Sequence, residues 1–253
     1  MLMEARSLRV TRVAFASADV PPAFDGLRIA FVSDIHYGSF VSRARVRQTV
    51  DRVNALHPDL IILGGDYIYR KQSGSDIGPV FAELARLRAP LGVYGVLGNH
   101  DVALLEVNVA PVMKAAGIHE LYDDGVWLRR GGDRIRLGGL SDTLPDSPLP
   151  PQVLGDATPE DFVLLVSHSP DVTESLGGTP VDLVLAGHTH GGQITAFGLW
   201  SPFVPSRYGN KYRAGMVASG PVPVYVTTGV GTIIVPLRFF ARPEVVLLTL
   251  RRT

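Results

Sequence analysis

The chain has 253 residues, of which 46% are hydrophobic and 19% are charged, a balance typical of a globular protein with its own core. It contains no cysteine, which excludes disulfides, thiolate metal sites and cysteine nucleophiles. Lys plus Arg and Asp plus Glu number 24 each, so the net charge of zero does not indicate nucleic-acid binding. Because cysteine is absent, any metal must be held by oxygen and imidazole ligands.

The first fifteen residues, MLMEARSLRVTRVAF, mix charges with apolar side chains and lack the continuous apolar core of a signal peptide. No stretch approaches the roughly 18 consecutive apolar residues that a membrane-spanning helix needs. We therefore expect a cytoplasmic protein, with peripheral contact with a membrane as an alternative.

Strands and helices alternate in the first half of the chain. Short apolar runs rich in branched residues predict strands over residues 8–15, 27–32, 59–63 and 92–97. Apolar residues at helical spacing predict helices over residues 42–56, 76–88 and 103–116. Ser42 is expected to cap the first helix and Pro58 to stop it. Such alternation indicates parallel βαβ units.

The second half of the chain is richer in strands. A hairpin is predicted over residues 126–130 and 134–140, and further strands over 162–166, 181–185, 222–227 and 245–250. Residues 143–160 read as a proline-rich loop. We predict an α/β fold with a mixed sheet or two packed sheets and helices outside, in one domain spanning residues 1–253.

Side chains that commonly bind metals follow five of the predicted strands. The carboxyl ends of strands in α/β sheets are where ligands bind, because loops diverge there above a rigid scaffold. The residues are Asp34 and His36 after the first of these strands, then Asp66, then Asn99 with His100 and Asp101, then His168, and finally His188 and His190.

These residue types suit two divalent metal ions. Asp34 and His36 are two apart on backbone expected to be extended, so their side chains point the same way and can grip one ion. Asp66 can bridge two ions through its two oxygens, and Asn99 offers an amide oxygen. Imidazoles come from His168, His188 and His190. This oxygen and nitrogen set favours Mn, Fe, Zn, Co or Ni, with Mn as our first choice.

Two metals suit phosphoester hydrolysis. A water bridging them becomes hydroxide near neutral pH, since its pKa falls from about 15.7 toward roughly 7, and can attack phosphorus in line. The leaving alkoxide then needs a proton. His100 is the best donor, with Asp101 beside it to set the orientation of the ring.

Each of these motifs has an ordinary structural alternative when taken alone. Asp66 could be a turn residue, Asn99 and Asp101 could cap a helix, and His168 could be a core histidine. Their joint occurrence at five strand ends makes that interpretation improbable. A Ser/His/Asp hydrolase is not supported, because no G-x-S-x-G elbow occurs. His57 and His119 lack such context and are expected at the surface.

The five motifs, in this order, resemble those of the calcineurin-like metallophosphoesterases. This resemblance implies a four-layer α/β/β/α sandwich with two mixed sheets. It implies one ion held by Asp34, His36, Asp66 and His190, a second held by Asp66, Asn99, His168 and His188, and His100 as proton donor. The residues 187–193 and 236–244 are similar to the YkuE/YaeI-like branch of small bacterial phosphohydrolases.

The substrate is less strongly indicated. Residues 194–212 mix aromatics with Arg207, Tyr208 and Lys211, which could bind substrate or could pack a loop over the core. The first hypothesis is hydrolysis of a phosphodiester or pyrophosphate in a lipid-linked or nucleotide substrate, such as UDP-2,3-diacylglucosamine, which the branch implies. The alternatives are a phosphomonoesterase or protein phosphatase and, less favoured because all ligands are present, a non-catalytic metal-binding scaffold.

Overall fold

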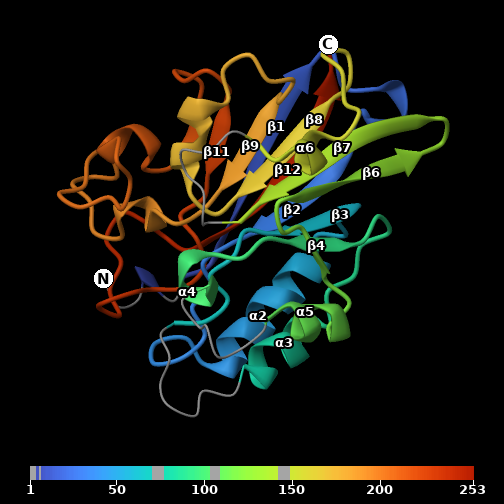
Figure 1. Cartoon of the computed structure of the whole chain (residues 1–253). Coiled ribbons are helices and arrows are strands. Elements are labelled where there is room, and N and C mark those ends of the chain that lie inside the picture. The colour runs from blue at the N-terminus through green and yellow to red at the C-terminus, as the bar shows by residue number, and fades with distance from the viewer. Residues whose placement is uncertain (1–3, 6, 70–76, 103–108, 142–148) are drawn as a thin grey trace.

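Two mixed six-stranded sheets form the centre of the fold (Figure 1). The computed structural model describes residues 4–5, 7–69, 77–102, 109–141 and 149–253. The first sheet has, in spatial order, β1 (Arg9–Ser17), β12 (Glu244–Arg252), β2 (Arg28–Val32), β3 (Leu60–Leu63), β4 (Val93–Gly95) and β5 (His119–Glu120). The second has β10 (Gly215–Val217), β11 (Val224–Val226), β9 (Leu183–Ala186), β8 (Val163–Ser167), β7 (Asp133–Leu140) and β6 (Asp124–Arg130).

Helices cover the outer face of each sheet. The first sheet carries α2 (Arg43–Asn54), α3 (Gly78–Leu84) and α5 (Val109–Ala115), which lie together below it in Figure 1. The second carries the short α6 (Pro151–Leu154) and the 3-10 helix η2 (Pro170–Ser175). This arrangement confirms the predicted α/β/β/α sandwich with two mixed sheets. One domain over residues 1–253 stays a prediction.

The central strands of the first sheet, such as β2 and β3, are buried on both faces. On β2, Ile29 and Phe31 point into the core between the sheets, whereas Ala30 and Val32 pack under the helices. On the second sheet, Leu164 of β8 faces the same inter-sheet core. Burial on both sides explains why these strands read as continuous apolar runs rather than as alternating ones.

Most predicted elements lie within a few residues of their expected bounds. Ser42 is the N-cap of α2, where its side chain accepts a hydrogen bond from Arg45 N at 3.3 Å. The hairpin of β6 and β7 is antiparallel as predicted. The sequence did not predict the short strands β5 and β10, and it placed α6 inside a loop. Residues 76, 103–108 and 143–148 of the predicted elements lie outside the described residues.

No helix in the described ranges is long and apolar enough to cross a membrane.

Candidate metal centre

The loops after β2, β3, β4, β8 and β9 bring the predicted ligands to one place between the two sheets. The carboxylate of Asp66 lies 3.4 Å from His36 Nε2 and 3.2 Å from His168 Nε2. The carboxylate of Asp34 lies 3.5 Å from His190 Nε2. Residues from both sheets, as far apart in sequence as Asp34 and His190, thus converge on a shared centre.

Two pairs of imidazoles meet nitrogen to nitrogen. The Nε2 atoms of His36 and His190 are 3.0 Å apart, and His188 Nδ1 lies 3.2 Å from His168 Nε2. Each pair gathers ring nitrogens near a carboxylate, as ligands of one cation do. Three groups in the described residues can each hold an ion: Asp34, His36 and His190; His36, Asp66 and His100; Asp34, Asp66 and His168.

Asn99 begins α4 (Asn99–Val102), directly after the loop that follows β4. Its side-chain oxygen Oδ1 is buried and has no hydrogen-bond partner, a rare condition among the described residues. A buried acceptor without a partner costs about 1–3 kcal/mol. A metal ion would supply the missing partner, so the donor set fits the metals expected from the sequence.

The backbone at the ligands is not extended, which corrects our expectation for Asp34 and His36. Their φ angles are 54° and 49°, and Asp66, His188 and His190 also have positive φ, at 54°, 68° and 52°. Residues other than glycine avoid this region of positive φ, and each residue held there costs on the order of 1–3 kcal/mol. The chain turns sharply at each strand end, and the surrounding packing holds this strained geometry in place.

Glycines permit the close approach of neighbouring loops to the two carboxylates. A Cβ on Gly98 would collide with the carboxylate of Asp66, and one on Gly187 would collide with the carboxylate of Asp34 and with Ser33. The Gly-Asn and Gly-His pairs in the sequence motifs therefore reflect close packing around the two Asp ligands.

Burial and mutual charges set the protonation of the centre. Burial lowers the pKa of His36 to about 3 and that of His188 to about 4, and it raises the pKa of Asp34 to about 6. Burial also acts to raise the pKa of Asp66, but the neighbouring imidazoles of His168, His36 and His100 together outweigh it and hold that pKa well below its usual range. Neutral imidazoles and an ionised Asp66 are the states that bind metal ions.

His100 lies at the edge of this cluster, half-buried. Its ring centre is 4.9 Å from that of His36 and 5.6 Å from that of Tyr69. Its backbone N–H donates to the carboxylate of Asp66 at 2.9 Å, which fixes its loop to a predicted ligand. This location is compatible with the predicted proton transfer.

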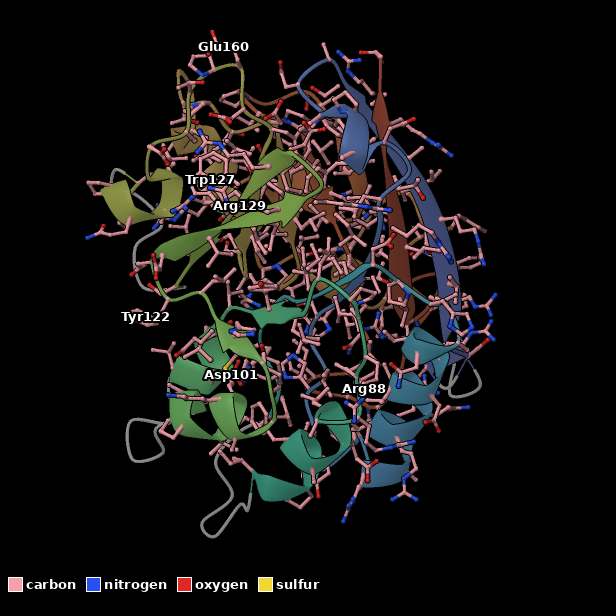
Figure 2. All side chains as sticks on the ribbon, turned by 90° about the vertical axis from the view of Figure 1, so that its right-hand side faces the viewer. Arg88, Asp101, Tyr122, Trp127, Arg129 and Glu160 are labelled. Carbon is pink, nitrogen blue, oxygen red and sulfur yellow. The ribbon has the colours of Figure 1, made fainter. Side chains whose placement is uncertain are left out.

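Asp101 contacts the backbone of the ligand loops, and its predicted orientation of the His100 ring stays a prediction. Its carboxylate is buried and accepts hydrogen bonds from the backbone N–H groups of Asp66 at 2.7 Å, Tyr67 at 3.0 Å and Gly98 at 3.0 Å. Figure 2 shows Asp101 within the fold, whereas Glu160 projects from its edge. The carboxylate thus ties together the loops after β3 and β4.

Arg238 is a residue that sequence reasoning missed. It is fully buried, and its guanidinium lies 3.3 Å from His190 Nδ1 while donating to the backbone carbonyls of Gly231 and Ala241 at 3.0 and 2.8 Å. Burial lowers its pKa to about 10, so it remains charged at neutral pH. The signal in the sequence was an arginine within the apolar run 233–241.

Of the predicted substrate residues, Arg207 and Lys211 contact η2, whereas the Tyr208 ring packs against Tyr212. Lys211 forms an ion pair with Glu174, and the backbone N–H of Arg207 donates to Asp171 at 2.8 Å. These contacts direct the segment toward the outer face of the second sheet. A role in substrate binding stays a prediction, and the Lys211 charge is already partnered. His57 and His119 are exposed, as expected.

A cluster of carboxylates and imidazoles at strand ends of an α/β/β/α sandwich defines a class of metal-dependent hydrolases. The family model described as calcineurin-like phosphoesterase matches residues 27–192, and the chain belongs to this family. It is therefore a metal-dependent phosphohydrolase.

Relatives cover nearly the whole chain. It is 31% identical over 253 residues to "Uncharacterized metallophosphoesterase YkuE" of Bacillus subtilis, spanning 99% of this chain and 88% of that protein. It is 32% identical over 246 residues to "Phosphodiesterase YaeI" of Escherichia coli, spanning 94% and 86%. Among solved structures, TT1561 of Thermus thermophilus covers 81% of this chain and 90% of its own, with a TM-score of 0.52 at 12% identity, which shows the fold alone.

Proposed function

We propose that this protein hydrolyses phosphodiester or pyrophosphate bonds at a centre holding two divalent metal ions, with Mn favoured. The observation that carries the proposal is the convergence of ligand atoms from five loops, together with the buried and unpartnered oxygen of Asn99. The relative named as a phosphodiesterase supports the diester as the bond cleaved.

The proposed ligand sets share one carboxylate. One ion would be held by Asp34, His36, Asp66 and His190, and the second by Asp66, Asn99, His168 and His188. The short distances from Asp66 to both His36 and His168 support a bridging position for this residue. When bound, two divalent cations neutralise charge on phosphoryl oxygens and make water acidic enough to serve as the nucleophile.

The remaining residues would handle the proton and the geometry. His100 lies at the edge of the cluster, where its ring can donate a proton to the oxygen that leaves phosphorus. Asp101 holds the loops of Asp66 and Asn99 in position through backbone hydrogen bonds. A lipid-linked or nucleotide substrate, a peripheral contact with a membrane and a cytoplasmic location are parts of this proposal that rest on sequence.

The experiment that tests the function compares bis-p-nitrophenyl phosphate with p-nitrophenyl phosphate, using metal-stripped protein resupplied with Mn²⁺. We expect metal-dependent turnover with preference for the diester. Preference for the monoester would replace the proposal by a phosphatase, and two bound metals without turnover of either would favour a scaffold. Asp66→Asn should lose most activity and retain less metal, because it removes the shared anionic ligand.

The role of His100 is tested by the leaving group. A poor leaving group, such as an alkoxide, needs a proton far more than p-nitrophenolate does. His100→Ala should therefore lose much more activity on alkyl diesters than on activated ones. His119→Ala, at an exposed histidine on β5, is the matched control and should leave both rates unchanged. Equal losses of His100→Ala on both substrates would remove it as the proton donor.

A further inference from the structure

An apolar pocket of about 250 Å³ adjoins the metal centre at His190. It lies between two loops, residues 189–205 and 233–235, that follow β9 and β11 respectively. Its apolar lining comes from Ile194, Pro202, Phe203, Pro205 and residues 233–235. Because His190 lies in its wall, a group bound here can belong to the same molecule as a phosphate at the metals.

Apart from His190, the polar side chains that line this pocket are already hydrogen-bonded to the backbone. Gln193 donates to the carbonyls of Ile233 and Val235 at 2.9 and 3.2 Å and accepts from Ile233 N at 2.9 Å. Ser201 Oγ is within 3.1 Å of three carbonyl oxygens, and Thr189 Oγ1 donates to the Arg213 carbonyl at 2.8 Å.

This saturation decides which chemical class the pocket suits. A nucleobase carries several donors and acceptors, and leaving them unpaired in a buried site costs about 1–3 kcal/mol each. An alkyl chain has no such groups, and it gains about 0.8 kcal/mol for each methylene that leaves water. The volume is also just below the roughly 300 Å³ at which pockets for drug-sized ligands begin. A short alkyl chain therefore fits the polarity and volume of this pocket better than a nucleobase with its sugar does.

The charge and surface around the pocket suit an anionic amphiphile. Residues 183–243 contain no acidic side chain, and of their five basic side chains Lys211 is paired with Glu174 and Arg238 is buried beside His190, which leaves Arg207, Arg213 and Arg242. Large apolar side chains of the two loops are exposed, with 80% for Leu199, 55% for Trp200 and 68% for the lining residue Ile234. The loops that follow β9 and β11 project together from one side of the fold (Figure 1).

We propose that the pocket beside His190 binds an alkyl chain of the phosphoester substrate, so that the enzyme selects amphiphilic phosphodiesters over nucleotides. This inference rests on the phosphodiesterase function proposed above and names its substrate class. Chain binding would place the phosphate at the metals, and the open rim would allow a longer chain to continue outward.

The test is a series of p-nitrophenyl alkyl phosphates, from methyl through butyl and hexyl to octyl, as monomers in solution with Mn²⁺-loaded protein. We expect kcat/KM to rise about fourfold per methylene while the chain enters the pocket, and then to level off. Ile194→Gln should flatten this rise, and Phe203→Gln is a second variant at a partly exposed lining position. Leu199→Gln makes the same change in polarity outside the pocket and should keep the rise.

A binding measurement separates this inference from the proposed function. Alkylphosphonates of the same lengths, titrated by calorimetry, should bind more tightly with each methylene, and Ile194→Gln should abolish the trend whether or not the protein turns over. Failure to hydrolyse even the methyl ester would argue against the phosphodiesterase function but would leave the alkyl-chain site to be judged by the binding measurement. The proposed alkyl-chain site would be overturned if binding tightened equally with chain length in the wild type and both pocket variants. It would also be overturned if this dependence on chain length appeared only when anionic vesicles were added.

Discussion

The carboxylate of Asp101 joins two loops of the metal centre, and its removal has a calculable cost. Its Oδ2 accepts from Asp66 N at 2.7 Å and Gly98 N at 3.0 Å, while Oδ1 accepts from Tyr67 N at 3.0 Å. In Asp101→Asn the amide oxygen can replace Oδ2, but the amide NH₂ group then faces the Tyr67 N–H, and both are donors. The buried Tyr67 N–H is then left without its acceptor.

A buried donor left without its acceptor costs about 1–3 kcal/mol. For a chain of this size, 1 kcal/mol shifts the melting temperature by roughly 2–4 °C, so Asp101→Asn should lower it by about 2–12 °C. Asp101→Ala leaves all three N–H groups without their acceptor and should cost more, because each buried donor without an acceptor costs about 1–3 kcal/mol. Asp124→Asn, at an exposed position on β6, is the matched control and should unfold like the wild type.

Circular dichroism on heating, with and without Mn²⁺, measures the stability of these variants, and their kinetics separate the two roles considered for Asp101. If it braces the loops, Asp101→Asn lowers kcat/KM equally for good and poor leaving groups. A melting temperature equal to that of the wild type would refute the reasoning. A loss confined to poor leaving groups, as expected for His100→Ala, would instead assign Asp101 to the orientation of the His100 ring.

Three further changes test other parts of the fold. Hydrogen bonds from Arg side chains lower the pKa of Glu83 from 4.5 to about 2, so its stabilising effect is complete above about pH 4.5 and is lost as the pH falls toward 2. The free energy of unfolding in urea should therefore be lower for Glu83→Gln than for the wild type at neutral pH, and the two values should converge in acid. A difference that does not change with pH would contradict this. Gly187→Ala should lower the bound metal measured by mass spectrometry, because its Cβ collides with a ligand carboxylate, whereas Gly132→Ala, with open space around it, should not. Arg238→Lys loses the planar guanidinium beside His190 and should retain less metal with unchanged secondary structure; full metal content would show that Arg238 does not hold that ring.

Local features of the sequence determined the elements and the identity of the site residues. The run 27–32 is apolar throughout because both faces of β2 are covered, and polar residues begin where the strand ends. The same change occurs after β3, β8 and β9. Because parallel strand ends meet at one edge of a sheet, the ordering of apolar run and ligand along the chain was enough to predict a common centre.

Only the tertiary structure decided features that depend on residues distant in sequence. β12, at the end of the chain, lies between β1 and β2, and its Glu244 binds Arg9 across 235 positions. The positive φ angles of the ligands follow from how the loops pack, since the isolated residues disfavour them. The guanidinium of Arg238 beside His190 likewise needs two distant loops in contact, and no local pattern specifies such a pairing.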